Sequence, residues 1–183
     1  METFYFFPFI LLLALSTVYE LVFTLLLQRN VNFWFSFYLL LEFYTLSYFF
    51  LKLLGHKILW TIFSTAYLVL FAALYFFRND HNELVLDGYL SAFTLVCMLV
   101  YSIMWLLKIV QQPTEKSLGG NPLFYYIGGM LLYLTGTLFL FLMGHVIYLK
   151  SRSDFQYFWL LNVGFSFLFR ILIIIGIWKD RKI

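Results

Sequence analysis

Six apolar stretches, separated by short polar gaps, are the feature of this sequence that most restricts its fold. A helix needs roughly 20 apolar residues to cross the hydrocarbon core of a bilayer, and each stretch reaches that length. The stretches cover residues 4–27, 31–54, 57–77, 84–108, 122–149 and 155–178. The sequence therefore predicts an all-α fold: a polytopic membrane protein with a six-transmembrane-helix bundle, forming a single domain over residues 1–183.

The composition agrees with lipid as the solvent of this chain. Hydrophobic residues make up 63% of the sequence and charged residues only 11%, whereas a soluble domain has about 25% charged residues. The chain has too little polar surface to cover a water-soluble globule, and the gaps between the stretches leave no soluble domain. The first residues lack a basic region and a small-residue cleavage site, so we expect a first membrane helix there and not a signal peptide.

The basic residues outside the stretches predict an orientation. With six spans both termini lie on one side of the membrane, and cytoplasmic loops carry an excess of Lys and Arg. That side would hold seven basic residues: Lys52, Lys57, Lys108, Lys116, Lys179, Arg181 and Lys182. The opposite side would hold four: Arg29, Arg78, Lys150 and Arg152. We therefore expect both termini in the cytoplasm. Basic residues this scattered do not form a nucleic-acid-binding patch.

Polar residues recur at helical spacing within the apolar stretches, which places them on single helix faces. Such stripes are costly in lipid, so we expect them to face the bundle interior or a hydrated cavity. The stripes are Ser16, Glu20, Thr24 and Gln28; Tyr38, Glu42 and Thr45; Asp87, Ser91 and Thr94; Thr137 and His145; and Asn162, Ser166 and Arg170.

Four of these residues fall in one outer layer on the expected topology and predict a ligand-binding pocket. They are Glu20, Asp87, His145 and Asn162, and their depths follow from a helical rise of about 1.5 Å per residue. Two acids and a histidine close together would attract a cation, a proton or an amine. The alternative for Glu20 is a protonated carboxyl group that forms a structural hydrogen bond.

Glu42 and Arg170 lie deeper, and we expect them to form an ion pair, because an unpaired arginine inside a membrane costs roughly 3 kcal/mol. This pair either fixes the helix register or acts as a gate that a ligand or proton opens.

The sequence predicts no cofactor, metal or catalytic residue. A haem of the membrane type needs paired histidines in the bundle, and His56 and His81 fall in gaps. A retinal Schiff base needs a lysine inside the bundle, and all seven lysines lie in gaps or at helix ends. No HExxH pattern supports a zinc site.

The segments "STVYELVFTLLLQRN", "LLLEFYTLSYFFLKLL", "NPLFYYIGGMLLYLTGTLFLFL" and "WLLNVGFSFLFRILIIIGIWK" carry a resemblance. Together they resemble a family of small, uncharacterised bacterial multi-pass inner-membrane proteins. The resemblance implies an inner-membrane helical bundle with a sensory or signalling role. It implies no activity and no functional residue.

Three functions fit the sequence. The first is a non-enzymatic membrane module that binds a small ligand or ion and acts through a protein partner. The second is a small transporter or channel for an ion, a proton or a small cationic solute. The third is a lipid-active enzyme, for which His145 and Asp87 are the candidate pair. Gly128, Gly136 and Gly144 recur every eight residues and predict close helix packing, either within the bundle or in a homodimer.

Overall fold

The computed structural model of the chain describes residues 2–20, 22–23, 32–77, 83–111, 118–150 and 152–180. Side chains within these ranges are described except at positions 2, 3, 20, 32, 33, 35, 83–85, 118, 141, 142, 144–146, 148–150, 152–159 and 162.

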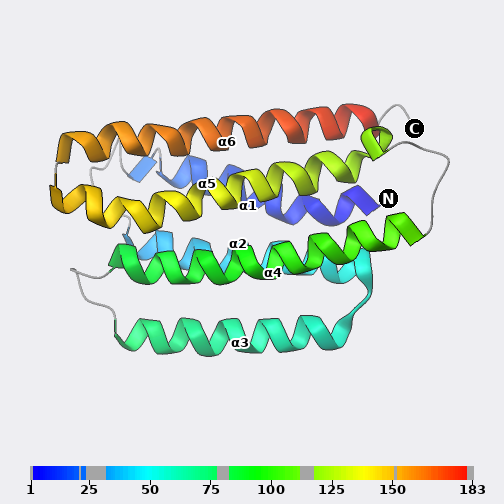
Figure 1. Ribbon diagram of the computed structural model, residues 1–183, viewed down its shortest axis with the longest axis horizontal. Coiled ribbons are helices and arrows are strands. Elements are labelled where there is room, and N and C mark those ends of the chain that lie inside the picture. The colour runs from blue at the N-terminus through cyan, green and yellow to red at the C-terminus, as the bar shows by residue number, and fades with distance from the viewer. Residues whose placement is uncertain are drawn as a thin grey trace. The chain divides into compact units, whose positions relative to one another are not determined.

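The described residues form helices and no strands, which confirms the all-α prediction (Figure 1). The six α-helices are α1 (Phe7–Glu20), α2 (Asn32–Leu54), α3 (Lys57–Phe76), α4 (Glu83–Gln111), α5 (Pro122–Lys150) and α6 (Arg152–Asp180). Two short 3₁₀ helices, η1 (Glu2–Phe6) and η3 (Leu118–Gly120), precede α1 and α5.

Local sequence signals explain where several helices begin and end. Asn121 caps α5, since its side-chain oxygen accepts a hydrogen bond from the N–H of Leu123 at 3.0 Å. Helix α2 ends where Gly55 adopts a φ of 76°, and the N–H of Gly55 donates to the carbonyl of Leu51 at 2.9 Å. Helix α1 covers Phe7–Glu20, and residues 22–23 are π-helical. Residues 21 and 24–30 lie outside the described part of the chain, so the end of the predicted 4–27 segment stays a prediction.

Four helical segments among the described residues are long and apolar enough to cross a membrane. They are Ser36–Leu54, Lys57–Phe76, Leu86–Gln111 and Pro122–Leu140. A shorter apolar helix covers Phe4–Tyr19. The chain is thus a helical, candidate multi-pass membrane protein, and membrane crossing by the first and sixth helices stays a prediction.

The chain divides into two compact units, Met1–Ala73 and Leu74–Ile183. The single domain expected over residues 1–183 stays a prediction. In the first unit, the 3₁₀ helix η1 packs against the end of α2 through Phe6, whose ring meets Phe49 edge-on at 5.0 Å. Both side chains are fully buried, so they anchor the start of the chain to α2.

Helix α3 is attached to α2 through aromatic side chains. Phe43 and Tyr67 stack with ring centroids 4.0 Å apart. The Tyr67 hydroxyl donates to the backbone carbonyl of Leu39 at 3.0 Å, and the Tyr44 hydroxyl donates to the carbonyl of Ser64 at 3.3 Å. Each tyrosine therefore reaches across to the backbone of the opposite helix, which satisfies its hydroxyl group inside an apolar contact.

In the second unit, α5 and α6 pack side by side (Figure 1), and glycines allow the close approach. A Cβ atom at Gly136 would lie 2.4 Å from the Phe165 ring. A Cβ atom at Gly129 would lie 3.0 Å from Phe169 and 3.1 Å from Leu172. Large side chains of α6 thus rest on the bare backbone of α5, as small residues permit at membrane helix contacts.

The glycine face differs from the predicted one. A Cβ atom at Gly128 would meet nothing within 4 Å, so Gly128 does not belong to this contact, and the side-chain position of Gly144 lies outside the described residues. The contact instead continues to Gly176 of α6, where a Cβ atom would lie 2.8 Å from the ring of Tyr126. The close packing itself is as expected, within one unit of the chain.

Candidate functional site

Asp87 starts a buried polar stripe on α4, within the candidate span Leu86–Gln111. Asp87, Ser91 and Thr94 are exposed by only 3%, 5% and 1%. The Thr94 hydroxyl donates to the carbonyl of Leu90 at 3.0 Å, which is the usual way to satisfy a helical threonine. The Ser91 hydroxyl is buried and has no hydrogen-bond partner among the described residues. The stripe therefore faces inward, as predicted, and it carries an unused hydroxyl one turn from an acid.

The other three residues of the predicted ligand pocket have backbone positions only. Glu20 ends α1, His145 lies near the end of α5, and Asn162 lies in the first half of α6. Their side chains lie outside the described residues. The pocket formed by Glu20, Asp87, His145 and Asn162 therefore stays a prediction.

Of the polar stripe that begins at Ser16 of α1, only the Ser16 side chain lies among the described residues. Ser16 is buried, and its hydroxyl accepts a hydrogen bond from the indole N–H of Trp34 at 3.3 Å. Tyr19 stacks on the same indole, with centroids 4.3 Å apart. The Ser16 face of α1 therefore packs against the start of α2.

Glu42 lies in the candidate span Ser36–Leu54 of α2 and is only 4% exposed. The Tyr38 hydroxyl donates to Glu42 Oε1 at 3.2 Å, so the two residues predicted to share a face do meet. Thr45 donates to the carbonyls of Leu41 at 2.8 Å and of Glu42 at 3.1 Å. The polar stripe on α2 is thus a short buried network inside an apolar helix.

Arg170 is exposed on α6. The face of α6 that packs on α5 consists instead of the large side chains next to the glycines, and Ser166 is only half-buried. The contact between α5 and α6 therefore does not use this stripe, and its expected orientation toward the bundle interior stays a prediction. Glu42 belongs to the first unit and Arg170 to the second, so their ion pair stays a prediction.

Two further serine hydroxyl groups are buried without a hydrogen-bond partner among the described residues. They belong to Ser47 of α2 and Ser64 of α3, and both lie inside candidate spans. A buried hydroxyl without a partner costs about 1–3 kcal/mol. Such groups indicate positions where water or a polar ligand would be held.

No group of three or more His, Cys, Asp or Glu side chains that could hold a metal ion occurs among the described residues. Cys97, a free thiol, is buried in α4.

Sequence reasoning missed three lysine–tyrosine contacts, made by two lysines at helix ends. The Lys52 ammonium lies over the rings of Tyr48 and Tyr5, 5.4 Å and 6.0 Å from their centroids. The Lys179 ammonium lies over the Tyr125 ring at 4.5 Å and donates to the Tyr125 hydroxyl at 2.6 Å. Tyr48 precedes Lys52 by four residues, so helical spacing indicates that contact. The contact between Lys179 and Tyr125 joins residues 54 apart in the sequence, so no local sequence pattern indicates it.

Comparisons with known proteins give no relative from which to transfer a function: no family model matches the chain, and neither a curated protein nor a solved structure matches it. The resemblance to small bacterial inner-membrane proteins therefore stays a prediction.

Proposed function

We propose that this chain is a multi-pass inner-membrane protein that binds a small cationic or protonatable ligand and acts through a protein partner, without catalysing a reaction itself. The four candidate spans and the mean hydropathy of +0.90 support residence in a membrane. Six spans with both termini in the cytoplasm complete the proposal.

The observation that carries the binding role is the buried pair Asp87 and Ser91 on α4. An acid inside a membrane span is expensive and marks a functional position by default. The Ser91 hydroxyl, one turn away, has no hydrogen-bond partner among the described residues. The carboxyl group of Asp87 would attract a cation or an amine, which could also use the Ser91 hydroxyl. Glu20, His145 and Asn162 complete the proposed pocket.

Ligand-dependent stability tests the binding role. The melting temperature of the detergent-purified protein is measured in sodium, potassium and methylammonium chloride at constant ionic strength. We expect at least one cation to raise the melting temperature of the wild type and to have no effect on Asp87→Asn. The matched control is Asp180→Asn, which removes an exposed acid at the end of α6 and should respond as the wild type does. An equal response in Asp87→Asn, or no response to any of the three cations, contradicts the proposal.

A second candidate function is a small transporter or channel. The observation that favours it is the pair of unpartnered hydroxyls of Ser47 and Ser64 inside two candidate spans, because a hydrated path would supply their missing hydrogen bonds. Flux of the same cations into sealed proteoliposomes separates the two functions. Flux that exceeds the rate of protein-free vesicles supports transport, and binding without flux supports the sensory module.

A further inference from the structure

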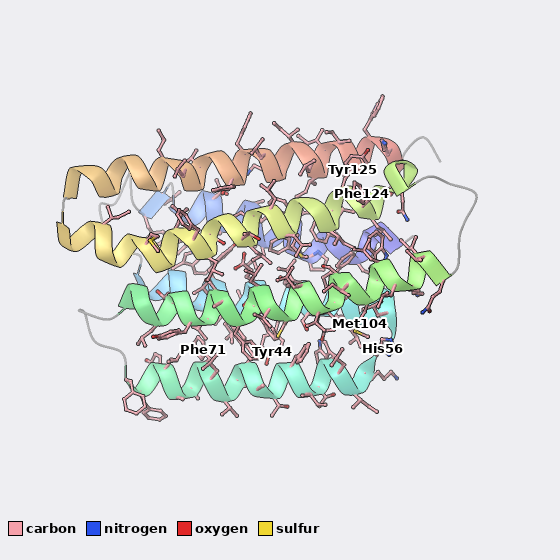
Figure 2. The ribbon with its side chains drawn as sticks, viewed as in Figure 1. Tyr44, His56, Phe71, Met104, Phe124 and Tyr125 are labelled. Atoms are coloured by element: carbon pink, nitrogen blue, oxygen red, sulfur yellow. The ribbon has the colours of Figure 1, made fainter. Side chains whose placement is uncertain are left out.

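The turn between α2 and α3 gathers three basic side chains at one end of this helix pair. Lys52 lies in the last turn of α2 and Lys57 begins α3. His56 lies between them, and Figure 2 shows it at the turn. All three side chains are exposed. The positive φ of Gly55 makes the reversal tight enough to keep the two lysines close to one membrane edge.

The turn and the helix ends that it joins contain no acidic residue, and Glu2 of η1, which packs against the end of α2, has a side chain outside the described residues. The sequence contains no Asp or Glu between Glu42 and Asp80, which covers the end of α2 and all of α3. The N-terminus of α3 adds the partial positive charge of a helix of 20 residues. The described contacts of Lys52 place its ammonium group over the rings of Tyr48 and Tyr5, and neither ring carries an anion that would neutralise it.

The turn also lies where a bilayer has its phosphate groups. One candidate span ends at Leu54 and the next begins at Lys57, so the lysines mark the edge of the apolar region. Tyrosine side chains are enriched at this level of a membrane, and Tyr48 and Tyr5 surround Lys52 here. The predicted topology puts this edge on the cytoplasmic side, where anionic lipids attract lysine and arginine.

Helix α3 continues from this turn as a bare apolar surface. Only 11% of its candidate span is buried. Ile58, Ile62 and Val69 are exposed by 79%, 57% and 64%. The helix is roughly 30 Å long from its rise per residue, which matches the hydrocarbon thickness of a bilayer. A cationic edge followed by an apolar face is complementary to an anionic phospholipid. The edge would contact the headgroup and the apolar face would contact the acyl chains.

We propose that the α2–α3 turn binds the phosphate headgroup of an anionic phospholipid, with its acyl chains along the exposed face of α3. Lys52 and Lys57 pair with the phosphate, and His56 supplies a further ring N–H for a hydrogen bond. Ile58 and Ile62 contact the acyl chains below the headgroup. The site rests on the proposed membrane residence of the chain, but it uses neither Asp87 nor the rest of the ligand pocket.

Native mass spectrometry of the detergent-purified protein, titrated with phosphatidylglycerol or phosphatidylcholine, tests this site. We expect the wild type to prefer phosphatidylglycerol. Each lysine near an anionic membrane surface contributes about 1 kcal/mol, so Lys52→Gln and Lys57→Gln should each weaken phosphatidylglycerol binding by about fivefold. The double variant should lose most of the preference. Binding of phosphatidylcholine should change little.

Lys108→Gln is the matched control, because Lys108 is an exposed lysine in the last turn of α4 on the same predicted side of the membrane. It should bind phosphatidylglycerol as the wild type does. Equal melting temperatures of all variants in phosphatidylcholine establish that the fold is kept. A titration with inorganic phosphate separates a lipid site from a simple anion site, and displacement of the lipid by millimolar phosphate would overturn the lipid assignment.

Failure of the proposed lipid site can be distinguished from failure of the proposed membrane residence. If the double variant binds phosphatidylglycerol as tightly as the wild type, the site is wrong and membrane residence is unaffected. If the wild type is extracted from membranes by alkaline washing, the proposed membrane residence is itself wrong.

Discussion

The Phe165 ring of α6 lies directly over the backbone of Gly136 of α5, so close that a Cβ atom at Gly136 would be 2.4 Å from the ring carbons. Real Cβ atoms do not approach this closely, and the ring would have to move. The contact between α5 and α6 therefore depends on the absence of one methyl group. This relationship gives the most direct test of packing in the second unit.

We expect Gly136→Ala to destabilise the protein by about 1–3 kcal/mol, the usual cost of overpacking a filled contact. Gly128→Ala is the matched control, since a Cβ atom there meets nothing within 4 Å and alanine favours a helix by about 1 kcal/mol relative to glycine. Thermal unfolding in detergent measures both. Equal melting temperatures for the two variants would show that α5 and α6 do not pack in this register.

Tyr38→Phe should destabilise the first unit, because it removes the hydroxyl that donates to the buried Glu42 carboxyl group. The loss of a hydrogen bond to a buried acceptor costs about 1–3 kcal/mol. Tyr89→Phe removes a hydroxyl from a side chain that is 52% exposed and should change the melting temperature little. If Tyr38→Phe and Tyr89→Phe have the same melting temperature, the hydrogen bond from Tyr38 to Glu42 contributes nothing to stability.

The attachment of α3 gives a graded pair of substitutions at Tyr67. Tyr67→Phe keeps the stack on Phe43 and removes the hydrogen bond to Leu39, so we expect a loss of about 1 kcal/mol. Tyr67→Ala also removes the ring and should cost about 3–5 kcal/mol. Hydrogen exchange of α3 measures the result. Fast exchange in Tyr67→Ala with near-native exchange in Tyr67→Phe is expected, and equal protection in both would show that another contact holds α3.

The predicted ion pair of Glu42 and Arg170 is tested by a double-mutant cycle. Arg170→Leu alone would leave a buried acid without its partner and should be about 3 kcal/mol less stable than Arg170→Leu combined with Glu42→Gln. Melting temperatures of the purified variants decide this. Additive effects of the two substitutions would exclude Arg170 as the partner of Glu42.

Much of the fold follows from apolar length and turn chemistry alone. Helices α2 and α5 begin and end within one residue of the predicted 31–54 and 122–149 segments, because asparagine, proline and glycine mark their ends. The end of the first helix at residue 27 stays a prediction, because α1 is described to Glu20 and residues 21 and 24–30 lie outside the described part of the chain.

The contacting faces were harder to predict than the helices. Glycines at intervals of eight were expected to share a face, but eight residues of an α-helix advance roughly 80° past two full turns. The contact uses Gly129 and Gly136, seven apart, which fall about 20° short of two turns and stay on one face. The face of α6 that meets α5 was not predicted for a related reason: spacing shows which residues share a face, and the large side chains of α6 decide which face meets α5.

The polar stripes on α1, α2 and α4 were predicted with more success. Ser16, Glu42 and Asp87 are each buried, as the cost of polar groups in lipid requires. Spacing alone does not identify the hydrogen-bond partner of each group. Ser16, for example, accepts its hydrogen bond from Trp34, which is 18 residues away in the sequence. The predicted pocket depends on such long-range pairings, which no local pattern encodes.

The location of the two chain ends tests the central claim, a six-span membrane protein, most directly. Epitope tags at residues 1 and 183 are probed with a membrane-impermeant reagent in intact and in permeabilised bacterial cells. We expect both tags to be protected in intact cells and to react only after permeabilisation, since six spans with cytoplasmic termini leave both ends inside the cell. Labelling of one tag and not the other in intact cells would require an odd number of spans and would contradict the account.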